Sequence, residues 1–159
     1  MQLPGTTLLV IDDDDHVRQR ISAHMERGGY DVLQARDASE GLAIFNAQRP
    51  GLVLCDLHLG DNSGYALVRE ITERDQDMPV IVISADGVMA DVVEALRLGA
   101  SDYLIKPLDD LVVLEHAVAR SLERSRLSLE NQRIRERLER ANRELENHIK
   151  ELRDDQAAG

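Results

Sequence analysis

Near its N-terminus the chain reads Thr7-Leu8-Leu9-Val10-Ile11, and Asp12 and Asp13 follow directly. A short, largely aliphatic and partly β-branched run is typical of a strand that is buried on both faces. Similar runs occupy residues 52–55 and 80–83, and the run at 52–55 also ends at an aspartate, Asp56. The sequence therefore predicts several buried strands that end in polar residues.

Amphipathic segments lie between these runs. Apolar residues recur at helical spacing in residues 17–25, 38–45, 67–71 and 92–96. A weaker strand signal occupies residues 30–33, and residues 101–105 form a fifth predicted strand. Strands that alternate with helices indicate βαβ units, so the expected fold is α/β, with a doubly wound five-stranded parallel sheet and helices on both faces.

Chemically useful side chains follow four of the predicted strands. They are Asp12, Asp13, Asp56, Ser84 and Lys106. The carboxyl ends of parallel strands meet at one edge of a sheet, which is where sites form in such folds. Clustered carboxylates repel one another unless a cation is present, and oxygen ligands favour a hard ion such as Mg²⁺. A carboxylate nucleophile with a nearby hydroxyl and ammonium indicates formation of an aspartyl phosphate.

Composition excludes several other classes of protein. The chain has 159 residues, and no apolar stretch is long enough to predict a membrane span. Its only cysteine, Cys55, cannot form a disulfide within the chain, which favours a reducing, cytoplasmic location. Residues 1–119 contain nine basic and 21 acidic side chains, and such an acidic domain repels nucleic acid.

The C-terminal part predicts a long helix with a coiled-coil seam. Leu138, Leu145 and Leu152 recur every seven residues, with Ile134, Ala141 and His148 at the companion positions. A bare leucine seam is costly in water, so pairing with a second copy of the chain is expected. An upstream line of Val118, Leu122, Ser125 and Leu129 has the same spacing in a different phase, which predicts a stutter before Ile134. The predicted seam residues are Leu122, Leu129, Ile134, Leu138, Ala141, Leu145 and Leu152.

Four short motifs resemble the signatures of CheY-like response-regulator receiver domains. They are Ile11-Asp12-Asp13-Asp14, Leu54-Cys55-Asp56-Leu57, Ile83-Ser84-Ala85 and Tyr103-Leu104-Ile105-Lys106-Pro107, in the order that the family has them. The resemblance covers about residues 6–120 and implies a flavodoxin-like fold. We therefore expect a receiver domain at residues 1–120, a coiled-coil helix at 121–155 continuous with the last receiver helix, and a tail at 156–159 that precedes an output domain.

The resemblance also implies a role for each site residue. Asp56 would accept a phosphoryl group, and Mg²⁺ would be bound by Asp12, Asp13, Asp56 and the backbone carbonyl of His58. Ser84 and Lys106 would each contact a phosphoryl oxygen, Tyr103 would change rotamer as Ser84 moves, and the Lys106–Pro107 bond would be cis. Two positions depart from the family pattern, because Gly60 and Asp15 stand where prolines are frequent.

The functional expectation is a phosphorylation-controlled switch that catalyses only its own phosphorylation and dephosphorylation, with any enzymatic output domain outside these 159 residues. A sensor histidine kinase or a phosphotransfer protein would donate the phosphoryl group, and the homodimeric stalk would pass the change to an output module or to an effector such as a sigma factor or an anti-sigma antagonist. The pattern is similar to regulators of the RssB type, with a PP2C-like module or a diguanylate cyclase as alternative outputs.

Two other functions remain open from the sequence. One is a pseudo-receiver that binds partners without phosphate. The other is an aspartate-nucleophile phosphatase, although such enzymes usually need a second aspartate at the position of His58.

Overall fold

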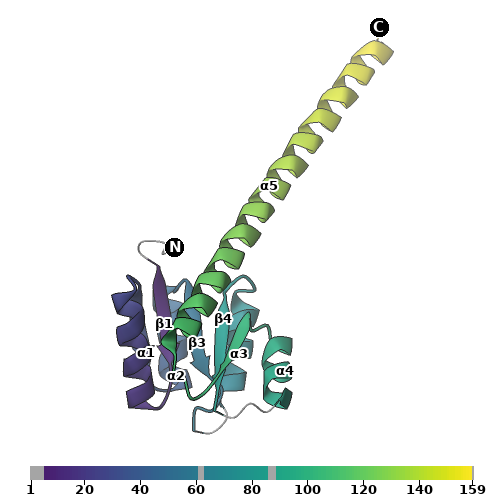
Figure 1. The fold of residues 1–159 in the computed structure, drawn as a ribbon. Coiled ribbons are helices and arrows are strands. Elements are labelled where there is room, and N and C mark those ends of the chain that lie inside the picture. Colours follow the sequence, from purple (N-terminus) through teal and green to yellow (C-terminus); the bar gives the residue numbers. More distant parts are fainter. Residues whose placement is uncertain (1–5, 61–62, 86–88, 159) are drawn as a thin grey trace. The chain divides into compact units, whose positions relative to one another are not determined.

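A computed structural model describes residues 6–60, 63–85 and 89–158. The strands are β1 (Thr7–Ile11), β2 (Asp31–Ala35), β3 (Leu52–Asp56), β4 (Val80–Ser84) and β5 (Asp102–Ile105). The helices are α1 (Asp15–Arg27), α2 (Ala38–Gln48), α3 (Ser63–Arg74), α4 (Met89–Arg97) and α5 (Leu111–Ala158) (Figure 1). The alternation of strands and helices confirms the predicted βαβ organisation.

All five strands are parallel, in the spatial order β2-β1-β3-β4-β5. This order explains why some strands are continuous apolar runs in the sequence and others are not. β3 and β4 are buried along their whole length, and β1 is buried except at Thr7, whereas the edge strands β2 and β5 each have a single buried residue among exposed and half-buried ones. Only the central strands are covered on both faces, so only they read as continuous apolar runs.

Alternate residues of the central strands enter two separate hydrophobic clusters. On one face, Leu9, Val53 and Val82 pack with side chains of α2, α3 and α4. On the other face, the neighbouring residues Leu8 and Leu54 pack with side chains of α1 and of the first turns of α5. The sheet therefore carries helices on both faces, and its strand ends are left to form a site.

The chain divides into two compact units. The first extends to Ser125 and includes the sheet and the first turns of α5, and the second consists of residues 126–159, of which 126–158 are described and helical. Within the described residues, no helix is both long and apolar enough to cross a membrane. Residues 1–5 of the predicted receiver and Gly159 of the predicted tail lie outside the described residues.

One part of the predicted seam has a different environment. Leu122 is 9% exposed and belongs to the cluster that α1 and α5 form with the sheet, and Val118 of the same line is fully buried there. Ser125, the last residue of the first unit, donates its hydroxyl to the carbonyl of Asp77 in the same unit (3.3 Å). Val118 and Leu122 of the upstream line thus pack on the sheet, whereas Leu129 of the same line is 40% exposed. The helix is continuous through the change of phase after Leu129, and the stutter stays a prediction.

Phe45 offers a sharp test of the packing, because it is the largest fully buried side chain. Truncation in Phe45→Ala should lower the free energy of unfolding by about 3–5 kcal/mol, since it removes apolar contact and leaves a cavity between α2 and the sheet. Urea denaturation measures this loss. The exposed Val112→Ala is the control and should change stability by less than about 0.5 kcal/mol. Equal effects of the two substitutions would contradict the assignment of Phe45 to the core.

Candidate functional site

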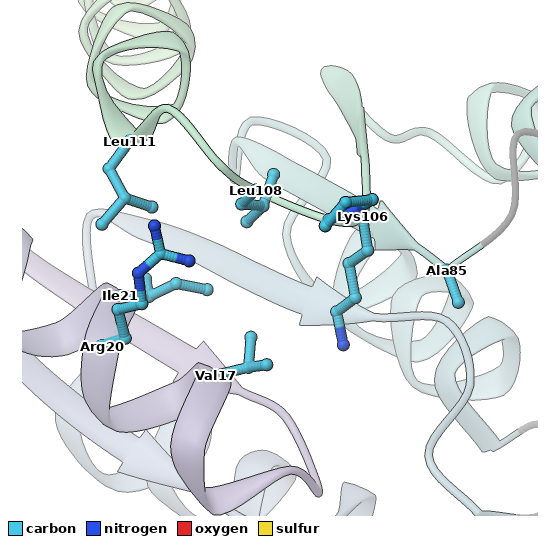
Figure 2. A pocket seen from close by; sticks show the side chains of 8 residues that line it. Val17, Arg20, Ile21, Ala85, Lys106, Leu108 and Leu111 are labelled. Carbon is cyan, nitrogen blue, oxygen red and sulfur yellow. The ribbon is translucent and has the colours of Figure 1, made fainter.

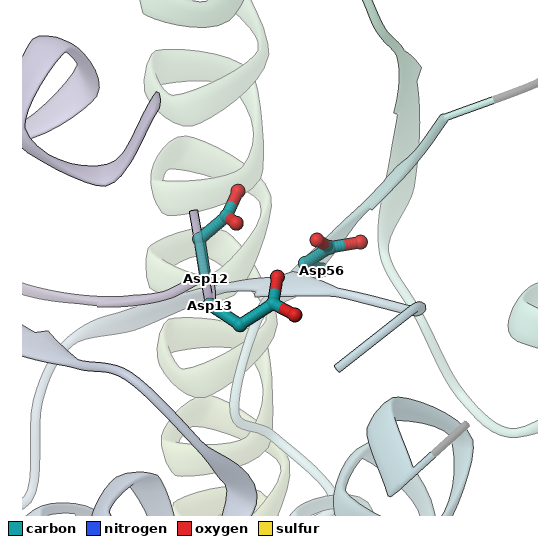
Figure 3. A group of neighbouring side chains, drawn as sticks. All are labelled: Asp12, Asp13 and Asp56. Atoms are coloured by element: carbon teal, nitrogen blue, oxygen red, sulfur yellow. The ribbon is translucent and has the colours of Figure 1, made fainter. Parts of the chain in front are cut away.

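Three carboxylates meet at the carboxyl edge of the sheet. Asp12 and Asp13 follow β1, and Asp56 is the last residue of β3 (Figure 3). One oxygen from each of the three lies within 4.8 Å of the others. Asp12 and Asp56 are 1% and 3% exposed, whereas Asp13 is exposed. The sheet order places β1 beside β3, which is why acidic residues 43 positions apart in the numbering form one cluster.

Lys106 joins this cluster from the β5 edge of the sheet. It follows β5, and its Nζ lies 3.1 Å from Asp56 Oδ2 and 3.0 Å from Asp12 Oδ2. Burial disfavours the ammonium, but the Asp12 and Asp56 carboxylates outweigh it, so the pKa of Lys106 is raised. The ammonium therefore stays protonated and partly compensates two buried negative charges.

The charge on Asp12 is nevertheless costly. Burial raises the pKa of its carboxyl, and the negative charge of Asp56 adds to this, while the N–H of Asp14 and the Lys106 ammonium act in the opposite direction. The Asp14 N–H donates to Asp12 Oδ1 at 2.9 Å. The Asp14 side chain in turn accepts from the N–H groups of His16 and Val17 and so caps α1.

Arg18 is a buried residue of this region that the sequence reading missed. It is 6% exposed, and its Nη1 donates to the backbone carbonyl of Asp12 at 2.9 Å. The same guanidinium contacts Asp15 through Nη2 (2.6 Å) and Gln34 of β2 through Nε (3.2 Å). It thereby fixes the acidic loop between β1 and α1. The sequence did contain one indication of this contact, because Asp15 and Arg18 are three residues apart and so share one face of the predicted helix.

A second group of contacts runs from the end of β3 to α4. The N–H of His58 donates to Asp56 Oδ1 (3.0 Å), and its imidazole Nε2 lies 3.5 Å from Asp91 Oδ2. Asp91 also interacts with the hydroxyl of Tyr65 on α3. Burial, together with this interaction and the charges of Asp91 and Glu94, raises the pKa of Tyr65 to about 12. Asp91 was not among the predicted residues, because nothing in its local sequence indicates these partners.

The predicted hydroxyl and aromatic residues lie at the ends of β4 and β5. Ser84 is the last residue of β4 and 2% exposed, and its backbone carbonyl accepts from the N–H of Lys106 (2.7 Å). Ile83, which precedes it, is the register partner of Asp56. Tyr103, the register partner of Val82, is 37% exposed. The Lys106–Pro107 peptide bond is cis, as the resemblance implies.

Glycines shape the loop between β3 and α3. A Cβ at Gly64 would collide with the backbone carbonyls of Asp56 and Leu57, so α3 can begin this close to the strand end only with glycine. Gly60, where the family often has proline, has φ = 71°. Proline fixes φ near −65°, so the backbone follows a different path here from the one that proline would impose.

Cys55 directly precedes Asp56 but lies in different surroundings. Its side chain is fully buried within the cluster formed with α2, α3 and α4. Burial raises the pKa of the thiol, and the charges of Asp56 and Asp12 raise it further. The thiol is therefore a small, protonated core group.

A largely apolar pocket of about 340 Å³ adjoins the acidic cluster. Figure 2 shows that α1 forms one wall and the segment after β5 the other. Its lining residues are Val17, Arg20, Ile21, Ala85, Lys106, Pro107, Leu108 and Leu111. Lys106 thus contacts both the carboxylates and the pocket.

The carboxylates fit a small divalent cation. Two ligands on opposite sides of Mg²⁺ lie about 4.2 Å apart, since each Mg–oxygen distance is about 2.1 Å, and the three oxygens within 4.8 Å of one another are compatible with this. The donor set consists of carboxylate oxygens, which hard cations prefer. Asp13 is exposed and open to an ion that arrives from solvent, whereas Asp12 and Asp56 are already buried and have little water left to lose.

Comparison with known proteins identifies the family. The family model for the response regulator receiver domain matches residues 8–119. This chain is a member of the response-regulator receiver family. The match spans β1 to the first turns of α5 and so includes every residue of the acidic site.

Individual relatives agree with this assignment. The C4-dicarboxylate transport transcriptional regulatory protein DctD of Pseudomonas aeruginosa is 37% identical over 130 residues, which are 82% of this chain and 28% of DctD. The acid tolerance regulatory protein ActR of Sinorhizobium medicae is 37% identical over 121 residues, 76% of this chain and 62% of ActR. The chain thus spans less than two thirds of the length of these curated relatives.

Solved structures give the same result. A response regulator receiver domain protein from Clostridium thermocellum has a TM-score of 0.72 and 31% identity, with 77% of this chain and 98% of that chain covered. NtrX from Brucella abortus has a TM-score of 0.77 and 32% identity, with 82% of this chain and 29% of NtrX covered. The predicted receiver fold is therefore confirmed.

Removal of one exposed carboxylate tests the predicted cation site. Magnesium should stabilise the parent chain, by about 2.7 kcal/mol at a concentration 100-fold above its dissociation constant. Asp13→Asn should fold but lose most of this magnesium-dependent rise in Tm, because it removes the exposed oxygen donor. Differential scanning calorimetry with and without Mg²⁺ measures the effect.

The matched control is Asp31→Asn, which makes the same chemical change at the opposite ends of the strands. Its response to magnesium should equal that of the parent. An undiminished magnesium response in Asp13→Asn would show that the ion binds elsewhere.

The contact between Tyr65 and Asp91 predicts a pH effect. The folded chain holds the Tyr65 proton to about pH 12, whereas an unfolded tyrosine loses it near pH 10. Between these values the unfolded state binds fewer protons, so the free energy of unfolding should fall as pH rises. Asp91→Asn should lower the pKa of Tyr65, but the increase in this pKa that burial causes should remain.

Titration of tyrosinate absorbance measures this pKa, and the difference between parent and Tyr65→Phe isolates the contribution of Tyr65. Asp75→Asn serves as control, since Asp75 lies at the other end of α3. An unchanged Tyr65 titration in Asp91→Asn would contradict the contact.

Proposed function

We propose that this receiver accepts a phosphoryl group on Asp56 in a reaction that depends on Mg²⁺, and that it thereby switches a dimeric coiled-coil stalk. The observation that carries the proposal is the arrangement of Asp12, Asp13 and Asp56 within 4.8 Å of one another, with Lys106 Nζ 3.1 Å from Asp56. Membership of the receiver family also supports it, because receiver domains are served by histidine kinases.

The residues have distinct tasks in the proposed transfer. A carboxylate oxygen of Asp56 attacks phosphorus, the new P–O bond forms, and the bond from phosphorus to the donor's nitrogen or oxygen breaks, with its electrons leaving on the donor. Asp12, Asp13, Asp56 and the carbonyl of His58 would hold Mg²⁺, which would neutralise negative charge on the transferred group. Lys106 and Ser84 donate to the remaining phosphoryl oxygens.

The ground state prepares Asp56 for this reaction. Its Oδ1 accepts from the N–H of His58 and its Oδ2 contacts Lys106, so the carboxylate is held in one orientation. Phosphorylation replaces a single negative charge with a larger one and draws Lys106 toward the new oxygens. The pairing of Lys106 with Asp12 then weakens, which gives the switch a local electrostatic cause.

An exposed apolar surface supports the proposed output. Among the described residues of the first unit, the exposed large hydrophobic side chains lie on α4, β5 and the start of α5. They are Val93, Leu96, Tyr103, Ile105, Val112 and Val113. Lys106 directly follows β5, so a movement of Lys106 and Tyr103 would alter this surface. We propose that it binds the protein that reads the phosphorylation state, of the class of a sigma factor or its antagonist.

The proposed phosphodonor is a sensor histidine kinase or a phosphotransfer protein. The pocket between α1 and Leu108 offers it an apolar surface beside Lys106. We further propose a cytoplasmic location, no enzymatic output within residues 1–159, and a homodimer through the helix of the second unit.

Intact-mass measurement after incubation with acetyl phosphate tests the central proposal. The parent should gain the mass of one phosphoryl group in the presence of Mg²⁺ and none without it. Asp56→Asn should gain none, because an amide is not a competent nucleophile, whereas Asp31→Asn should behave like the parent.

Beryllofluoride, a stable phosphoryl mimic, separates a short-lived phosphate from a pseudo-receiver. A mimic-induced change in the parent that Asp56→Asn lacks would support the switch. If the parent shows no adduct and no response to the mimic, phosphorylation of Asp56 is refuted. That result would favour phosphate-independent partner binding.

A further inference from the structure

The helix of the second unit carries an unpartnered apolar stripe. Its large side chains are 44–61% exposed, namely Leu127, Ile134, Leu138, Leu145, Ile149 and Leu152. A helix turns about 100° per residue, so residues seven apart differ by only about 20° in direction. Leu127 therefore shares the face of Ile134, whereas Leu129 lies about 140° away. The stripe begins at Leu127 and excludes Leu129 and Leu122.

This frame assigns the core positions of each heptad. Leu138, Leu145 and Leu152 occupy position a, and Leu127, Ile134, Ala141 and His148 occupy position d. The a position before Leu138 is Asn131. A single polar asparagine at an a position specifies register and oligomeric state in coiled coils, because it is satisfied only opposite another polar group.

Charges flanking the seam distinguish the two orientations of a pair. In a parallel, in-register pair, position g of one helix faces the following position e of the other. Glu130 then meets Arg135 of the second copy twice, by symmetry, and the other g–e contacts, such as Arg137 with Asn142, bring no like charges together.

The antiparallel alternative with full seam overlap is less favourable. Position g then faces position g, which brings Arg137 to Glu144 but also Glu130 to Glu151. The attractive and repulsive contacts offset each other. The same alignment sets Asn131 against His148 rather than against a second Asn131.

We infer that the partner of this stripe is a second copy of the chain, aligned parallel and in register, with Asn131 of each helix paired at the interface. The inference rests on the proposed homodimer and specifies its geometry. It places the two receivers at the same end of the stalk.

Disulfide crosslinking of the full chain tests the orientation. Leu127 and Leu152 are 25 positions apart, or about 37 Å along the helix. In the parallel pair, Leu127→Cys should crosslink with itself, and so should Leu152→Cys. In the antiparallel pair each variant alone should fail, and only their mixture should crosslink. Cys55 is buried and can remain in place.

The two variants separate the possible failures. Crosslinks found only in the mixture would overturn the parallel register but leave the homodimer intact. A monomer by sedimentation equilibrium, with no crosslinks, would overturn both. The mass assay on Asp56 is independent of either result, so loss of the phosphorylation proposal is recognised separately.

Substitution of the asparagine tests how the pair is specified. Asn131→Leu should shift sedimentation from a single dimer to a mixture that includes larger oligomers, with a higher Tm of the helical stalk. Asn147→Leu makes the same change at outward position c and should remain dimeric. A purely dimeric Asn131→Leu with unchanged Tm would exclude Asn131 from the interface.

Discussion

The contact of one ammonium with two buried carboxylates governs the organisation of the receiver's site. Alternate strands of a sheet lie about 9–10 Å apart, so a group that follows β5 can reach Asp56 at the end of β3 only through a long, flexible stem. Lys106 does so and also contacts Asp12. Without this positive charge, two aspartates that are nearly inaccessible to water would lack compensation, which is strongly unfavourable in a protein interior. The third carboxylate, Asp13, stays exposed and leaves the cluster with excess negative charge for a cation.

The strand that Lys106 follows, β5, also carries part of the exposed apolar surface. Tyr103 and Ile105 precede Lys106 on β5, an edge strand whose outer side is not covered by another strand. An edge strand has fewer neighbours that resist a small displacement. A change of charge at Asp56 and a change of shape on the surface can thus be connected through one short segment, without a rearrangement of the central strands.

The sequence predicted the features that depend on local pattern. The central strands, the acidic cluster and the position of Lys106 follow from apolar runs and from the rule that parallel strands end together. Asp91 could not be predicted, because its partners are set by helix packing rather than by neighbouring residues. For Arg18 the spacing from Asp15 was visible in the sequence, but its contact with Gln34 of β2 depends on the packing of α1. Leu122 shows what apolar spacing cannot predict. The 4-3 spacing identifies an apolar face of the helix but not what that face packs against, and the structure packs Leu122 against the sheet.

The position of Cys55 has a consequence for chemical selectivity. A thiolate is intrinsically a better nucleophile than a carboxylate, and here a cysteine adjoins the aspartate that we propose is modified. Strand geometry turns the two side chains to opposite sides, and burial together with the charges of Asp56 and Asp12 keeps the thiol protonated. An electrophile or oxidant that reaches the strand ends therefore meets carboxylates and no thiolate beside Asp56.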